Sequence, residues 1–214
     1  MYKDNFKLYF LTPFHMKHTH HYLSELIATF ALTLAVLLTL KVGGLATPIA
    51  AALTLGLFVY TVGGISGAHV NPAITIGLLA VEKISPSKAV GYIIAQLAGA
   101  GLAMILVQNT VTLPAVGVDP DIWKIGIAEA LGTAFLAWGV MAVVAGKISD
   151  AASGLVIGGS LLLGIIIAAA LGANGALNPA VAFGINSWSI AYFVAPIIGS
   201  VLAMLLYRFV SSRS

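Results

Sequence analysis

The chain has 214 residues, of which 60% are hydrophobic and only 8% are charged, and its mean hydropathy is +1.04. Soluble domains usually have about 25% charged residues, so water cannot solvate a surface this poor in charge, and lipid is the natural solvent. The formal net charge is only +3, and the absence of cysteine excludes disulfide and thiol chemistry.

Apolar runs long enough to cross a bilayer core, which takes about 20 residues, recur along the chain. We predict six spans, at approximately 22–40, 49–65, 89–107, 125–145, 154–171 and 190–210. Because many apolar runs follow the first, that run is not a removable signal peptide. Two shorter apolar pieces, about 72–81 and 179–187, are each about ten residues long. A helix of that length rises about 15 Å, so these pieces can enter the membrane but cannot cross it.

The two halves of the sequence repeat, with repeat one at about 22–110 and repeat two at about 122–210. The matching motifs are Glu25-x-x-x-Thr29 with Glu129-x-x-x-Thr133, and Asn71-Pro72-Ala73 with Asn178-Pro179-Ala180. Each repeat has three spans, an odd number, so the second must enter the membrane from the opposite side. Inverted repeats of this kind place the functional site at the midplane, at broken helices.

The basic residues predict the orientation. With six spans both termini lie on one side, together with eight of the ten lysines and arginines; only Lys41 and Lys124 fall on the other side. The positive-inside rule therefore predicts that both termini, including an N-terminal segment at 1–21, are cytoplasmic.

The two Asn-Pro-Ala motifs each predict a helix start. Asparagine is a preferred N-cap, and proline is favoured at the next position because its missing N–H costs nothing there. The half-helices that begin at Pro72 and Pro179 would therefore meet near the midplane, N-terminus to N-terminus. Their partial positive charges disfavour cations at the centre of the membrane. The amides of Asn71 and Asn178 can also donate hydrogen bonds to a water in a pore, which would interrupt a proton wire.

The segment before each motif is rich in glycine and irregular. Irregular backbone at membrane depth is tolerated where it lines a water-filled cavity or is buried in protein. We predict that a stripe of carbonyl groups lines the pore, contributed by Gly67, Ala68 and His69 and by Asn174, Gly175 and Ala176. His69 could instead gate the pore or sense pH, although a static pore-lining role is favoured.

Glu25 and Glu129 lie inside predicted spans, where a carboxylate costs about 2.5–3.5 kcal/mol and so needs partners in the protein interior. One interpretation is the proton relay of a transporter. The other, favoured by the matched spacing to each Asn-Pro-Ala motif, is that each carboxylate accepts N–H groups from the irregular loop of its own repeat.

The segment Ser66-Gly-Ala-His-Val-Asn-Pro-Ala-Ile-Thr75 resembles the first signature of the aquaporin (major intrinsic protein) family, and Asn174-Gly-Ala-Leu-Asn-Pro-Ala180 resembles the second. The resemblance covers about residues 22–210. It implies an all-α membrane protein with six transmembrane helices and two re-entrant half-helices, arranged in a right-handed bundle. It also implies one pore per subunit, a homotetramer in the plasma or inner membrane, and glutamates that hold the two loops.

The resemblance also points to the residues of a selectivity filter. The family normally has an arginine directly after the second Asn-Pro-Ala, where this chain has Val181. Counting back from Asn178 without gaps places Ile166 at a filter position that is often histidine in the family, and Gly175 at another filter position. Counting back from Asn71 places Ala51 at a filter position that is aromatic in the family. Such a filter would be wide and apolar. It predicts a passive channel for water and small uncharged solutes such as glycerol, urea, ammonia or neutral metalloid acids.

Two other functions stay open from the sequence: an ion-coupled secondary transporter, and a closed structural membrane protein of the same fold. An enzyme is disfavoured because no nucleophile–base pair lies in the membrane, and nothing favours nucleic-acid binding or a cofactor. The N-terminal histidines at 15, 18, 20 and 21 fit no standard metal site, so no metal is expected.

Overall fold

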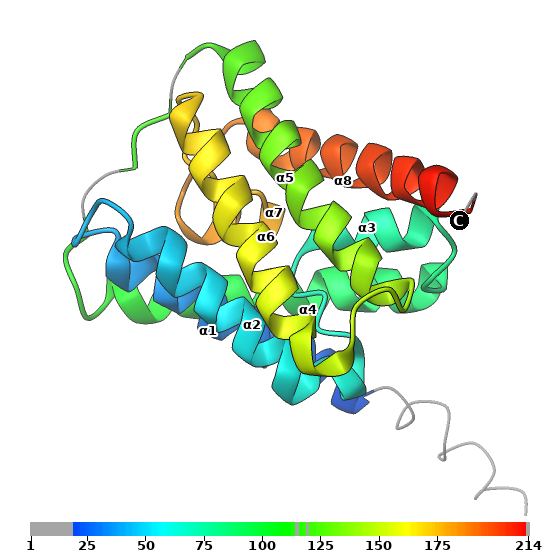
Figure 1. The fold of residues 1–214 in the computed structure, drawn as a ribbon. Coiled ribbons are helices and arrows are strands. Elements are labelled where there is room, and N and C mark those ends of the chain that lie inside the picture. The colour runs from blue at the N-terminus through cyan, green and yellow to red at the C-terminus, as the bar shows by residue number, and fades with distance from the viewer. Residues whose placement is uncertain (1–18, 114–115, 119, 213–214) are drawn as a thin grey trace, which may run out of the picture.

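The computed structural model describes residues 19–113, 116–118 and 120–212. Within these residues the fold is all-helical (Figure 1), with helices α1 (Thr19–Thr39), α2 (Ala46–Ser66), α3 (Pro72–Ala80), α4 (Pro86–Gln108), α5 (Ile122–Val144), α6 (Asp150–Ala170), α7 (Pro179–Gly184) and α8 (Ile190–Ser211). Six of them are long and apolar enough to cross a membrane, namely α1, α2, α4, α5, α6 and α8. The predicted six spans and two half-helices are confirmed. Most of the predicted N-terminal segment 1–21 lies outside the described residues.

Local sequence explains where the helices begin. Asp121 precedes α5, and its side chain accepts hydrogen bonds from the N–H groups of Trp123 and Lys124, at 3.0 and 3.1 Å. Ser85 precedes α4 and accepts from the N–H of Lys88, with Pro86 at the first helical position. These caps satisfy N–H groups that have no partner within the helix.

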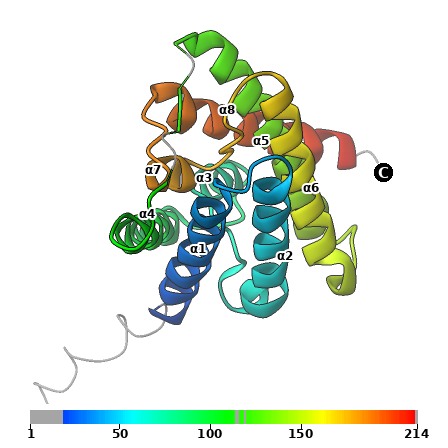
Figure 2. The same cartoon turned by 90° about the vertical axis from the view of Figure 1, so that its left-hand side faces the viewer.

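The two repeats pack in matching ways. Helix α1 packs against α2 and α4, as α5 packs against α6 and α8, and α2 meets α6 where the repeats join. Each half-helix also packs against the last span of the other repeat, α3 against α8 and α7 against α4. Figure 2 shows α7 and α3 between the long helices α4 and α8, where both can support a central path.

Glycine permits the closest helix contacts. A Cβ atom at Gly99 in α4 would clash with the carbonyl oxygen of Leu26 in α1, and one at Gly199 in α8 would clash with that of Ala130 in α5. The two contacts occupy corresponding places in the two repeats. Small residues let membrane helices approach until their backbones touch, which is the main source of packing energy in lipid.

We expect Gly199→Ala to destabilise the protein, because the added methyl group would meet the backbone of α5 rather than a movable side chain. Overpacking of this kind costs about 1–3 kcal/mol. Gly159→Ala in α6 is the matched control, since a Cβ there meets nothing within 4 Å and alanine is the better helix former. Thermal unfolding in detergent should give a lower midpoint for Gly199→Ala only; equal midpoints for the two variants would contradict the close contact.

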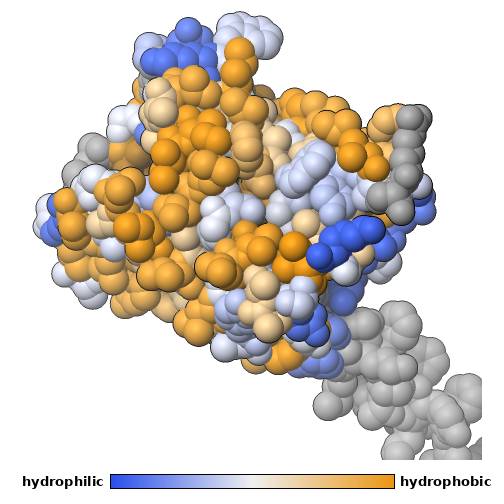
Figure 3. Space-filling model, viewed as in Figure 1, coloured by the Kyte–Doolittle hydropathy of each residue, from blue (hydrophilic) through white to orange (hydrophobic). Residues whose placement is uncertain are grey.

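The outer surface suits a lipid environment. In Figure 3 hydrophobic residues cover the middle of the visible face, and hydrophilic residues gather at its margins. Two exposed tryptophans flank the second repeat at the end where α5 and α8 begin: Trp123 is 80% exposed and Trp188 is 60% exposed. Such aromatic residues are typical of the boundary between lipid and water.

Candidate functional site

The two Asn-Pro motifs cap the half-helices that they precede. The Oδ1 atom of Asn71 accepts the N–H of Ala73 at 2.8 Å. In the same way Asn178 accepts the N–H of Ala180 at 3.0 Å and, at 3.4 Å, that of Val181. Pro72 and Pro179 occupy the first helical positions.

The same two asparagines also join the repeats. The Nδ2 atom of Asn71 donates to the carbonyl oxygen of Leu177 at 2.8 Å, and Nδ2 of Asn178 donates to that of Val70 at 2.9 Å. Each amide therefore binds the residue directly before the other motif. A side-chain amide has two N–H donors, so this bond leaves one donor of each asparagine for a molecule in the adjoining cavity, which both side chains line.

The loops before the motifs have matching strained backbones. Val70 and Leu177, each directly before an asparagine, have φ values of 53° and 50°, and Ala68 and Gly175 are left-handed as well, at 48° and 67°. Left-handed conformations cost non-glycine residues about 1–3 kcal/mol and persist only where the surroundings fix them.

Glu25 fixes the first loop. It is fully buried, and its Oε1 accepts from the N–H of His69 at 2.9 Å and from Oγ of Ser66 at 2.7 Å. Its Oε2 accepts from the N–H of Val70 at 2.6 Å and from Nε2 of Gln96 at 2.8 Å. Four hydrogen bonds therefore stabilise this carboxylate inside the membrane region.

Glu129 has the corresponding place in the second repeat. It is also fully buried, and it accepts the N–H groups of Ala176 at 3.0 Å and Leu177 at 2.6 Å. Neither glutamate is among the residues that line the central cavities described below. Both carboxylates have the contacts expected for holding a loop, and a proton relay along the path gains no support from their positions.

Two tyrosines complete this support, and the sequence analysis missed them. The hydroxyl of Tyr92 donates to the carbonyl oxygen of Ser66 at 2.5 Å, and the hydroxyl of Tyr192 accepts the N–H of Asn174 at 3.0 Å. Both side chains are buried. Tyr92 is the seventh residue of α4 and Tyr192 is the third of α8, so no fixed offset in the sequence marks them as a pair.

Two cavities follow one another through the bundle. We call the cavity of about 280 Å³ the narrow cavity and the cavity of about 600 Å³ next to it the wide cavity. Both are lined by Ala68, His69, Ile74, Val140 and Ile157, so they adjoin at the first loop. Together they run past both asparagines and form a candidate pore.

The walls of the narrow cavity are mainly aliphatic and include no lysine, arginine, aspartate or glutamate among the described residues. Their apolar side chains include Leu32, Val36, Leu55, Leu136 and Leu161. Apart from Thr47 of α2, the polar groups come from the two loops and their asparagines. Ala68, His69, Asn174, Gly175 and Ala176 of the predicted carbonyl stripe line this cavity, and Gly67 lines the wide cavity. The candidate pore thus has residues of the two loops on one part of its wall and aliphatic side chains on most of the rest.

Three of the four predicted filter residues, Ala51, Gly175 and Val181, line the narrow cavity. Ile166 does not: its side chain is 39% exposed on the outer surface, and Ile165, 7% exposed, takes its place next to Gly175. The expectation for Ile166 is therefore corrected to Ile165. Successive residues of a helix point about 100° apart, so an error of one position turns a lining residue outwards.

His69 lies at the junction of the two cavities with its ring fixed on two sides. Its Nδ1 is 3.1 Å from Oγ1 of Thr75, which also accepts from Nε2 of Gln96 at 3.0 Å. The ring of Tyr92 meets the imidazole edge to face, with 4.9 Å between ring centroids. These contacts hold the ring in place and favour the static role over a moving gate.

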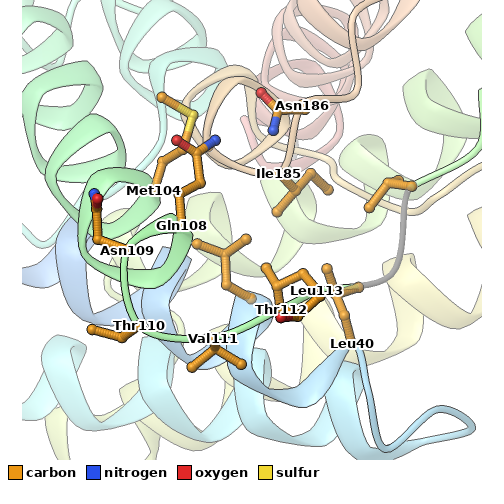
Figure 4. Close-up of a pocket in the computed structure, with 13 residues that line it drawn as sticks. Leu40, Met104, Gln108, Asn109, Thr110, Val111, Thr112, Leu113, Ile185 and Asn186 are labelled. Atoms are coloured by element: carbon orange, nitrogen blue, oxygen red, sulfur yellow. The ribbon is translucent and has the colours of Figure 1, made fainter.

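The wide cavity opens where charged residues gather. Lys83, Lys88 and Asp150 line it together with Tyr60, whose hydroxyl binds the start of α6. A side pocket of about 700 Å³ flanks the other end of the pore (Figure 4) and shares Leu40 and Ile185 with the narrow cavity. Loop residue Val116, which the sequence analysis did not single out, lines both the side pocket and the narrow cavity.

Comparison with known proteins gives consistent matches. The family model described as major intrinsic protein matches residues 13–207. Aquaporin AqpM of Methanothermobacter thermautotrophicus is 32% identical over 197 residues, covering 80% of this chain and 80% of that protein. Glycerol uptake facilitator protein-like 6 of Lactiplantibacillus plantarum is 34% identical over 217 residues, covering 90% and 98%. The X-ray structure of the aquaglyceroporin from Plasmodium falciparum shares the fold, with a TM-score of 0.75 at 21% identity, over 92% of this chain and 98% of that one.

Proposed function

The chain belongs to the major intrinsic protein family, whose members are passive channels for water and small solutes, and from this premise we propose that its pore passes larger neutral molecules as well as water. Glycerol, urea, ammonia and uncharged metalloid acids are the solutes that we propose. The relatives' names include both aquaporins and glycerol uptake facilitators.

One observation supports a wide range of solutes. The four filter residues Ala51, Ile165, Gly175 and Val181, which all line the narrow cavity, include no cation and no side-chain hydrogen-bond donor. An arginine after the second Asn-Pro-Ala would narrow the passage and donate hydrogen bonds, and Val181 does neither. Loop carbonyls can accept from solute hydroxyl or amino groups, while the aliphatic wall accommodates a carbon skeleton. Proton exclusion then depends on the half-helix dipoles and the two asparagines, and we expect it to be weaker than in members with the arginine.

We further propose that the wide cavity faces the cytoplasm and that the protein is a homotetramer with one pore per subunit. The beginning of α1, the end of α8 and the turns after α3 and α5 lie toward one side of the bundle (Figure 1). Lys83 and Lys147 lie in those turns, and Lys88 follows in the first turn of α4. A cytoplasmic location of this side agrees with the positive-inside rule. The tetramer rests on the family alone.

Stopped-flow light scattering of proteoliposomes tests the proposed function. We expect fast shrinkage in hyperosmotic sucrose, and in glycerol or urea fast shrinkage followed by re-swelling as the solute enters. Liposomes without protein give the background rate. Water flux together with exclusion of every proposed solute would contradict the wide pore, and absence of all flux would contradict an open channel.

A further inference from the structure

The bundle is open on one side. Helices α4 and α8 do not pack against each other anywhere along their lengths, both of which the structure describes. The half-helices α3 and α7 fill the space between them, each packed against both α4 and α8. Figure 2 shows α7 and α3 in this intermediate position. Here the half-helices, rather than long helices, form the wall between the pore and the membrane.

A groove of about 600 Å³ lies at this opening, and the lining residues that the structure describes are all apolar. The floor includes Pro72 and Pro179, the first residues of the two half-helices, and both prolines are buried. One side includes Leu97 and Ala98 of α4, and the other includes Phe193 and Ile197 of α8. The groove therefore touches both repeats at the point where each Asn-Pro motif begins its helix.

The position of the groove along the membrane-spanning helices shows which part of the bilayer it faces. The two half-helix N-termini meet within the bundle, as the bond from Asn71 Nδ2 to the Leu177 carbonyl oxygen shows. Both α4 and α8 are long enough to cross a membrane, and the groove lies along residues 93–98, near the middle of α4, and along residues 193–197, in the first half of α8. It therefore opens to the hydrocarbon core of the bilayer, where neither water nor a lipid headgroup is available.

We propose that a lipid acyl chain occupies this groove and supports the two half-helices from behind. An empty apolar groove would deprive its lining atoms of dispersion contacts, and a flexible hydrocarbon chain can restore them. A helix from a second copy is the other apolar occupant, but membrane helices associate through small residues or polar side chains. Among the described residues of the lining, Ala98 is the single small aliphatic side chain, and polar side chains are absent.

The site has a consequence for the pore. Pro72 and Pro179 touch the groove on one side, while Asn71 and Asn178, directly before them, line the narrow cavity on the other. The acyl chain and the permeating molecule are thus separated by the first turn of each half-helix. The proposed acyl-chain site requires that the protein spans a membrane, but it does not depend on which solute passes through the pore. A result that overturns the acyl-chain site therefore leaves the proposed solute range standing, and the reverse also holds.

Photolabelling with a phosphatidylcholine that has a diazirine near the middle of one acyl chain tests the proposal. We expect adducts of the wild-type protein to concentrate on the α4 and α8 residues of the groove. Ala98→Phe should reduce labelling of the groove by about tenfold, because the ring fills the space that the chain would occupy. Leu202→Phe is the matched control, since Leu202 is 62% exposed on α8 but does not line the groove. Thermal midpoints in detergent near that of the wild type would show that both variants are folded.

Labelling spread evenly along the exposed face of α8, or labelling that Ala98→Phe leaves unchanged, would overturn the proposal. A second measurement does not depend on Ala98→Phe. Because the chain has no cysteine, Leu97→Cys introduces a single thiol at the rim of the groove. Oxidation in the bilayer should leave this variant uncrosslinked if lipid fills the groove. A disulfide-linked dimer would show instead that a second copy covers it.

Discussion

A Val181→Arg variant is expected to lose most glycerol and urea permeation, by about tenfold or more, while it retains water flux. Val181 is 4% exposed and lines the narrow cavity in the first turn of α7, so a longer side chain there must extend into the passage. The guanidinium group would occupy space that a carbon skeleton needs, and its donors would orient water. Its positive charge should also lower any proton leak. The measurement is re-swelling of proteoliposomes after shrinkage, with a pH-sensitive dye for protons.

Val181→Met separates charge from size in this experiment. Methionine adds length without a donor or a charge, so we expect a partial loss of glycerol permeation and no change in proton leak. If Val181→Arg and the wild type pass the same solutes at the same rates, then the ring of Ala51, Ile165, Gly175 and Val181 does not determine selectivity.

A Glu25→Ala variant is expected to lose the folded pore. The substitution leaves four donors without their acceptor: the N–H groups of His69 and Val70, the hydroxyl of Ser66 and the amide of Gln96. Each buried donor left unpaired costs about 1–3 kcal/mol, and the left-handed backbone at Ala68 and Val70 loses what holds it. We expect a lower thermal midpoint in detergent and little water flux in liposomes.

Glu25→Gln should have a smaller effect, because one oxygen remains to accept while the new NH₂ group faces two donors. Glu82→Gln is the control, since Glu82 is exposed in the turn after α3. A Glu25→Ala protein with wild-type midpoint and flux would show that the loop keeps its shape without the carboxylate.

Much of this architecture could be predicted because membrane burial imposes strict local rules. Asn71-Pro72 and Asn178-Pro179 begin helices for reasons contained in two residues each, namely a capping side chain and a missing N–H. Span number follows from apolar length, and the inverted arrangement follows from an odd number of spans per repeat. Each of these features requires only neighbouring residues or a count.

The features that escaped prediction depend on rotation about helix axes and on contacts distant in sequence. Placing Ile166 in the filter required its rotation about the axis of α6 to within one residue, and a fixed offset cannot give that through an irregular loop. Helix α7 ends at Gly184 rather than near 187, because Asn186 turns into a left-handed conformation with φ 58°. Val116 reaches the pore from a loop, where Asn174 donates to the neighbouring Gly117 carbonyl oxygen. No periodic pattern marks such a contact.

The exchange of hydrogen bonds between Asn71 and Leu177, and between Asn178 and Val70, also constrains how the protein is made. A ribosome synthesises repeat one first, and while it does so the amide of Asn71 and the carbonyl of Val70 have no partner. Both groups remain without these partners until about a hundred further residues have been added to the chain. A truncated chain that ends between the repeats would therefore leave both groups unpaired. Two half-length chains facing in opposite directions would satisfy both groups by exchanging the same pair of bonds.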